Sequence, residues 1–182
     1  MSLSVAVFGS SEPAAGDPLY ELARDLGSRL AAAGYEVVTG GYGGVMEGAS
    51  RGAHEAGGAT HGVTCRIFAE RAPNAFLTRT SETADLFART AALMEADGFV
   101  VLHGRSGTLA ELTWLWALSR AGSLGRRPVV LLGAWWGSFL RELVRLRMIE
   151  DGELSITRVA DSPGDAVEAL DRFFAAEGDR GS

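Results

Sequence analysis

Lysine is absent from the sequence, in which all 17 permanently charged basic side chains are arginine. Pyridoxal-phosphate enzymes hold their cofactor as a Schiff base with a lysine, and Walker-type nucleotide-binding loops place a lysine on the phosphates. The composition therefore excludes both chemistries, including decarboxylation through pyridoxal phosphate.

Cysteine is almost as scarce, because Cys65 is the only one. A single cysteine cannot form an internal disulfide and leaves no cysteine pair for a zinc site. His54 and His61 do not have the spacing of metal ligands on one helix, so we expect no metal and no resident cofactor. The lone cysteine and the absence of a basic leader before the first apolar stretch favour a cytoplasmic protein.

Long apolar runs and long basic runs are also missing. No stretch approaches the roughly 18 residues of a membrane span, so we expect no membrane partner. The net charge of −6, without a basic cluster, argues against a nucleic-acid partner. At 182 residues the chain is expected to form one domain over residues 1–178, with a frayed tail at residues 179–182.

What the sequence does contain is an alternation of short apolar strands with longer helical segments. The predicted strands are Leu3–Gly9, Tyr35–Gly41, Thr60–Cys65, Gly98–Leu102 and Arg127–Gly133. The predicted helices cover residues 17–33, 44–58, 82–96, 109–121, 136–148 and 164–176, and residues 66–73 are predicted to be irregular. This alternation is typical of a Rossmann-like, doubly wound α/β fold with a mainly parallel sheet and helices on both faces.

Three strand ends carry glycine-rich or small polar turns: "GSSEP", "TGGYGGVMEG" and "HGRSGTLAE". In doubly wound sheets ligands bind beyond the carboxyl ends of the strands, where the strand order reverses. Glycine lets backbone N–H groups converge on an anion, and a helix start adds the positive end of its dipole. Each turn alone is explained somewhat better by turn geometry than by ligand binding. Together they favour a small ligand that carries a phosphate, and their spacing does not match the dinucleotide motif GxGxxG.

Backbone and side-chain groups of these turns make up the predicted phosphate- and nucleotide-binding set. It consists of Gly9, Ser10, Gly40, Gly41, Gly43, Gly44, Met46, Gly104, Arg105, Ser106, Gly107 and Thr108. Arg105 is the ambiguous member, because its guanidinium could clamp a phosphate with two hydrogen bonds or could block the space that a glycine would leave open.

Two motifs carry a resemblance to a known family. In the first, Gly40, Gly41, Gly44 and Met46 match a glycine-rich motif that ends in Gly-x-Met, and Tyr42 interrupts its glycines. The second family motif is Pro-Gly-Gly-x-Gly-Thr-x-x-Glu. It is matched by Gly104, Gly107, Thr108 and Glu111, whereas His103 stands in place of the proline and Arg105 in place of the second glycine.

A helix with Arg89 completes the resemblance. Arg89 matches the arginine of the family's Arg-Lys pair, and Thr90 replaces the lysine. The stretch from Arg89 to Asp97 is also one residue shorter than the family pattern. One residue on a helix is about 100° of rotation, so Arg89 is expected to aim differently unless the deletion falls in the following turn.

Over nearly the whole chain these features resemble the cytokinin riboside 5′-monophosphate phosphoribohydrolases, a family whose members also carry the label lysine decarboxylase. The resemblance implies a Rossmann-like homodimer that hydrolyses the N-glycosidic bond of a nucleoside 5′-monophosphate. The substrate would be AMP or a cytokinin-riboside-monophosphate-like nucleotide, and the products would be free base and ribose 5-phosphate.

Glu111 and Arg89 are the predicted catalytic residues. Glycoside hydrolysis passes through an oxocarbenium-like state, which a carboxylate such as Glu111 can stabilise while it holds the ribose hydroxyls or activates the attacking side. Arg89 would support the leaving base or fix the phosphate. The structural alternatives are a helix-dipole role for Glu111 and a surface ion pair of Arg89 with Asp85.

A non-catalytic function is compatible with the same residues. The departures at Arg105 and Thr90 favour a nucleotide or phosphorylated-cofactor carrier, similar to molybdenum-cofactor carrier proteins, whereas Glu111 and Arg89 together favour the hydrolase. A pure interaction protein would require the glycine turns to be accidental. Four tryptophans, Trp114, Trp116, Trp135 and Trp136, are expected in the core or, as a second interpretation, in a dimer interface.

Overall fold

The computed structural model describes residues 2–178, and the tail predicted at residues 179–182 lies outside them. Within the described residues seven strands form one sheet in the order β4-β3-β2-β1-β5-β6-β7, and every neighbouring pair is parallel. The strands are β1 (Ser4–Phe8), β2 (Glu36–Thr39), β3 (Thr60–Cys65), β4 (Arg79–Thr83), β5 (Gly98–Val101), β6 (Val129–Leu132) and β7 (Thr157–Ala160).

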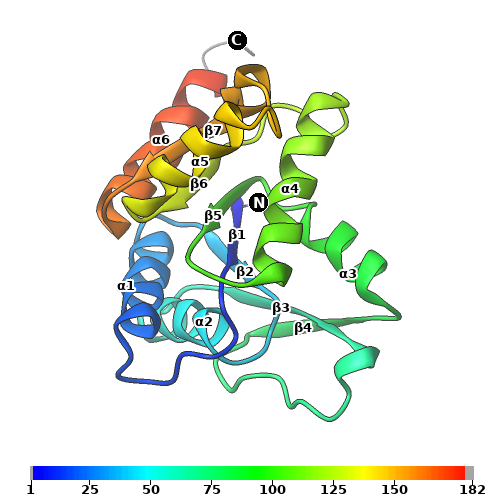
Figure 1. Ribbon diagram of the computed structural model, residues 1–182. Coiled ribbons are helices and arrows are strands. Elements are labelled where there is room, and N and C mark those ends of the chain that lie inside the picture. The colour runs from blue at the N-terminus through cyan, green and yellow to red at the C-terminus, as the bar shows by residue number, and fades with distance from the viewer. Residues whose placement is uncertain (1, 179–182) are drawn as a thin grey trace.

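Helices cover both faces of this sheet (Figure 1). They are α1 (Pro18–Ala32), α2 (Val45–Glu55), α3 (Leu86–Leu93), α4 (Ser106–Arg120), α5 (Trp135–Arg145) and α6 (Pro163–Gly178), with short 3₁₀ turns η1 (Arg66–Phe68) and η2 (Asp151–Ile156). The core contacts place α1, α2 and α6 on one face and α3, α4 and α5 on the other. The predicted Rossmann-like α/β fold is confirmed.

The alternation of side chains along the central strands explains the two layers. In β1, Val5 and Val7 pack toward α1, α2 and α6, whereas Ala6 and Phe8 pack toward the opposite helices. Because successive side chains of a strand point to opposite faces, a fully apolar strand requires cover on both sides. No helix within residues 2–178 is both long and apolar enough to cross a membrane.

Both edges of the sheet differ from the sequence prediction. The helix predicted from Glu82 is wrong at its start, because Arg79–Thr83 forms the edge strand β4 and α3 begins only at Leu86. Residues 157–160 form the unpredicted edge strand β7. An apolar sequence pattern does not reveal these two strands, because four of the five β4 residues and the two central β7 residues are exposed.

Helices α1 and α2 pack at very short range. A Cβ added to Gly27 would lie 2.0 Å from the carbonyl oxygen of Ala49, and one added to Gly52 would lie 1.9 Å from that of Arg24. Both neighbours are backbone atoms, which cannot move without separating the helices. The two glycines therefore fix the position of α2, whose N-terminus faces the turn after β1.

We predict that Gly27→Ala lowers the free energy of unfolding by about 1–3 kcal/mol, because the methyl group forces α1 and α2 apart. Gly137→Ala is the matched control, since its Cβ would meet only the end of the Arg141 side chain, at 3.5 Å. At this partly exposed position of α5 that change should be neutral or slightly stabilising. Urea denaturation measures both, and equal effects of the two substitutions would contradict the packing argument.

Candidate functional site

The strand order reverses at β1, which lies between β2 and β5. The turn after β1 is hydrogen-bonded to the turns that follow both neighbours. The backbone N–H of Ser10 donates to the carbonyl of His103 at 3.0 Å, and the N–H of Val45 donates to the carbonyl of Ser10 at 2.8 Å. The three turns that the sequence singles out therefore meet at one edge of the sheet.

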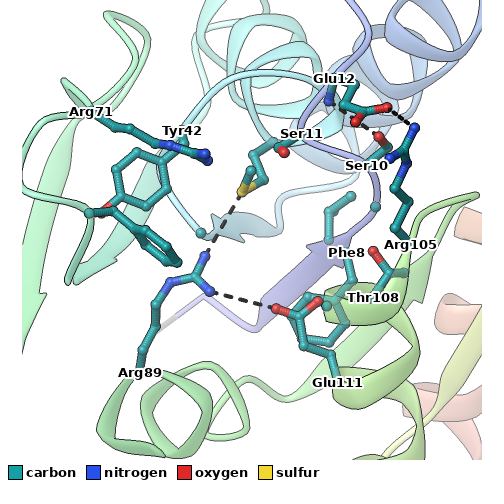
Figure 2. A pocket seen from close by; sticks show the side chains of 16 residues that line it. Phe8, Ser10, Ser11, Glu12, Tyr42, Arg71, Arg89, Arg105, Thr108 and Glu111 are labelled. Carbon is teal, nitrogen blue, oxygen red and sulfur yellow. Dashed lines mark hydrogen bonds and ion pairs between the residues drawn. The ribbon is translucent and has the colours of Figure 1, made fainter. Parts of the chain in front are cut away.

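A cavity of about 200 Å³ opens at this edge (Figure 2). Its lining comprises Val7, Phe8, Gly9, Ser10, Ser11, Glu12, Gly40, Tyr42, Met46, Phe68, Arg71, Arg89, Arg105, Gly107, Thr108 and Glu111. Most of the predicted site residues are among them, and they come from the turns after β1, β2 and β5 and from helices α2, α3 and α4.

The other predicted residues are not part of the lining. Gly44 has a φ of +73°, and a Cβ on it would lie 2.3 Å from the carbonyl oxygen of Ser10. A Cβ on Gly104 would lie 2.1 Å from the hydroxyl of Thr108. These two glycines allow the turns to approach one another. Three further predicted residues are also outside the lining: Gly41, Gly43 and Ser106.

Helix α4 presents its first turn to the cavity. The helix begins at Ser106, three residues before the predicted start, so Gly107 and Thr108 belong to this turn. Arg105, at the N-cap, makes no side-chain capping hydrogen bond. Thr108 is only 4% exposed and lines the cavity. An uncapped first turn offers free N–H groups and the positive end of the helix dipole, which together suit an anion.

Arg105 lies at the rim of the cavity and not inside it. Its side chain is 76% exposed, and its Nη2 is 2.9 Å from Oε2 of Glu12. Of the two roles considered for Arg105, blocking the anion-binding space is therefore excluded in this arrangement, because the guanidinium lies outside that space. An exposed ion pair of this kind contributes about 0–1 kcal/mol, so a ligand phosphate could replace Glu12 at little cost.

Arg89 and Glu111 meet on the floor of the cavity. Nη1 of Arg89 lies 3.8 Å from Oε1 of Glu111, and the two side chains are 12% and 16% exposed. Arg89 is held by a hydrogen bond from its Nε to the carbonyl of Val63 at 2.9 Å. The predicted alternative of an ion pair with Asp85 is wrong, because Asp85 caps α3 and accepts from the N–H of Ala88.

Gly40 leaves the space that Arg89 occupies. A Cβ at this position would lie 1.7 Å from Nη2 of Arg89 and 2.7 Å from Sδ of Met46. The shorter stretch after Arg89 does not turn the side chain away from the site, since the guanidinium lies beside Glu111 (Figure 2). Its Nη2 is also 3.9 Å from Sδ of Met46.

A family model matches residues 2–155, which is most of the chain. The protein belongs to the SLOG cluster4 family. The match establishes this family and not the phosphoribohydrolase family that the motifs resemble. A search of curated proteins found no match.

Solved structures similar to this SLOG cluster4 protein cover nearly the whole chain. The protein TM1055 is 30% identical over 93% of this chain and 99% of its own, with a TM-score of 0.72. A molybdenum cofactor binding protein from the phototrophic bacterium Rippkaea orientalis is 25% identical over 96% and 98%, with a TM-score of 0.76. The Moco carrier protein from Chlamydomonas reinhardtii, at 24% identity over 97% and 99% with a TM-score of 0.74, shows the same fold.

One wall of the cavity in this SLOG cluster4 protein consists of residues that the sequence motifs do not mark as binding residues. Tyr42 is buried there, and its hydroxyl accepts a hydrogen bond from the N–H of Cys65 at 2.9 Å and donates one to the carbonyl of the same residue at 3.2 Å. Phe68 packs edge-on against the Tyr42 ring, and Arg71 lies over Phe68. No sequence signal marks Phe68 and Arg71, which belong to the stretch predicted to be irregular.

The remaining conspicuous residues lie outside the cavity lining. His103 is exposed and packs its ring edge-on against Trp135. Trp116 and Trp136 are buried, as expected for core residues, whereas Trp114 and Trp135 are partly exposed. Among the described residues no group of three or more histidine, cysteine, aspartate or glutamate side chains could hold a metal ion.

Burial raises the pKa of Glu111 to about 7, and the nearby Arg89 partly offsets this effect. The carboxyl group therefore exchanges its proton near neutral pH. A group with this pKa can act as a general acid or base at physiological pH, whereas an ordinary exposed glutamate is fully ionised there.

The raised pKa predicts how stability depends on pH. A carboxyl group that binds its proton more tightly in the folded chain stabilises the fold below its ordinary pKa of 4.5 and loses this contribution as the pH rises through about 7. Between about pH 5 and pH 8, wild type should lose roughly 2 kcal/mol of unfolding free energy relative to Glu111→Gln. Denaturant titrations at both pH values provide the test, and parallel pH profiles would contradict a pKa near 7.

Proposed function

We propose that this SLOG cluster4 protein hydrolyses the N-glycosidic bond of a nucleoside 5′-monophosphate and releases free base and ribose 5-phosphate. One observation carries the proposal: a buried carboxyl group, Glu111, lies beside Arg89 in a cavity whose rim is the uncapped first turn of α4. The cavity thus combines a place for an anion with a titratable group one helical turn away.

The phosphate would bind at the first turn of α4. Backbone N–H groups of Gly107 and Thr108 are available there, and the hydroxyls of Ser10 and Thr108 line the same space. Arg105 would exchange Glu12 for the phosphate and close the rim. This set contains no lysine, which is consistent with the composition of the chain.

The ribose would lie over Glu111. As the bond from C1′ to the base nitrogen breaks, positive charge develops at C1′, and the ionised carboxylate stabilises it or removes a proton from the attacking water. The water oxygen forms the new bond to C1′, and the base leaves with the bonding electron pair and takes up a proton. Arg89 would stabilise the negative charge that develops on the departing base.

A carrier function is the second candidate. It is supported by the similarity to the molybdenum cofactor binding protein of Rippkaea orientalis along almost the full length of both chains. It is also supported by the departures from the hydrolase motif at His103 and Arg105. In this case the same cavity would hold a phosphorylated cofactor without cleaving it.

Incubation with AMP and other nucleoside monophosphates, followed by chromatography for free base, tests the proposed function. Wild type should release base, and Glu111→Gln should lower kcat about 10²- to 10⁴-fold while nucleotide affinity changes much less. Glu95→Gln is the matched control, because Glu95 is exposed after the end of α3 and does not line the cavity.

Tight binding of nucleotides without base release would favour the carrier and reject the hydrolase. Equal activity of Glu111→Gln and Glu95→Gln would reject the proposed role of Glu111. The two measurements therefore separate the function of the cavity from the function of one carboxyl group.

We further propose that the protein forms a homodimer through α3 and α4. These helices cover the same face of the sheet and expose Leu86, Phe87, Leu109 and Trp114, of which Phe87 is 80% exposed. Figure 1 shows both helices on the right-hand side of the molecule. A second copy that placed the same apolar surface opposite would remove these side chains from water.

Light scattering coupled to gel filtration should give the mass of a dimer for wild type and of a monomer for Phe87→Glu/Trp114→Glu. Leu146→Glu, which changes an exposed leucine after the end of α5, should leave the dimer intact. A monomeric wild-type protein would reject the dimer, and disruption by Leu146→Glu would place the interface elsewhere.

A further inference from the structure

The wall formed by Tyr42, Phe68 and Arg71 faces the cavity from the side opposite to α4. Figure 2 shows Arg71 and Tyr42 on one side of the opening and Arg105 and Thr108 on the other. The ring centroids of Tyr42 and Phe68 are 5.7 Å apart, with the planes nearly perpendicular at 87°. A ligand with its phosphate at α4 would therefore extend its other end toward an aromatic surface.

Arg71 differs from the other two cavity arginines in its contacts. Arg89 lies beside Glu111, and Arg105 is paired with Glu12. The Cζ atom of Arg71 lies over the Phe68 ring, 5.3 Å from its centroid, and its side chain has no carboxylate partner or hydrogen bond within residues 2–178. Its backbone N–H donates to the carbonyl of Phe68 at 2.8 Å, which ties the two residues together.

A guanidinium that lies over an aromatic ring retains free N–H groups along its edge. Two of these N–H groups form a fork that matches two neighbouring acceptors in one plane, such as the oxo group and ring nitrogen of guanine. Adenine presents an amino donor in place of the oxo acceptor, so one arm of the fork would face another donor.

We infer that Arg71 binds the acceptor edge of a fused heteroaromatic ring with an oxo group beside a ring nitrogen. Guanine, hypoxanthine and pterin have this edge, and adenine does not. The inference rests on the proposed function only in placing the phosphate at α4, and it narrows the base to the oxo class. The aromatic side chains around Arg71 supply a surface for a flat ring, whereas a second phosphate would require further N–H or hydroxyl donors there.

Calorimetric titration with GMP, IMP and AMP tests the inference. Wild type should bind GMP and IMP at least about tenfold more tightly than AMP. Arg71→Ala should reduce this preference to less than about threefold, mainly because it weakens the binding of GMP and IMP. Arg66→Ala is the matched control, since Arg66 lies in the same connection, is exposed and paired with Glu82, and does not line the cavity.

Titration with 6-hydroxymethylpterin monophosphate distinguishes the two sources of the ring. Binding of this pterin in preference to GMP, with the same loss in Arg71→Ala, supports the inference and indicates a pterin ligand. Preference for GMP indicates a nucleotide.

A wild-type protein that binds AMP as tightly as GMP and the pterin overturns the inference and leaves the proposed function standing. The inference is also overturned if Arg71→Ala weakens the binding of all ligands equally, because Arg71 would then contribute charge and not selectivity. Failure of every phosphate ligand to bind rejects the proposed function, and the inference falls with it.

Discussion

The turn after β1 is held on both sides by the backbone of Ser10, and the arrangement of the site depends on this constraint. The N–H and the carbonyl of this one residue join it to the turns that follow β5 and β2. Both bonds require the turns to approach within hydrogen-bonding distance, which the missing side chains of Gly44 and Gly104 permit. Without this approach the first turn of α4 and the wall at Tyr42 would not enclose the same space.

On the floor of the cavity, the carboxyl group of Glu111 is largely buried, and its negative charge is only partly compensated by Arg89. Glu111 loses hydration, and Arg89 lies 3.8 Å away, which is too far for a close hydrogen-bonded pair. The desolvation of the carboxyl group therefore outweighs the attraction of the guanidinium, and the proton affinity of Glu111 rises. A closer, hydrogen-bonded pair would have kept the carboxylate ionised and deprived the site of a group that titrates near neutrality.

Short sequence patterns predict the central strands of the sheet and the residues on the floor of the candidate site. They do not predict the edge strands of the sheet or the aromatic wall of the cavity. Apolar strands such as Val5–Phe8 are covered on both faces, so their composition alone reveals them. The edge strand Arg79–Thr83 is largely exposed and is defined by its pairing with β3, which no local pattern encodes. Because no sequence pattern predicts β4, the position of the connection that precedes this strand cannot be predicted either. The positions of Phe68 and Arg71 could therefore not be predicted, whereas Glu111 and Arg89 could be proposed from motifs.

The contact between Gly40 and Arg89 makes two distant positions depend on one another. Position 40 follows β2 and position 89 lies in α3, yet a Cβ on one would occupy the volume of the guanidinium on the other. A larger residue at position 40 would therefore force the end of the Arg89 side chain to shift from its place beside Glu111. Gly40 has no side chain, and this absence provides the space in which the guanidinium of Arg89 lies.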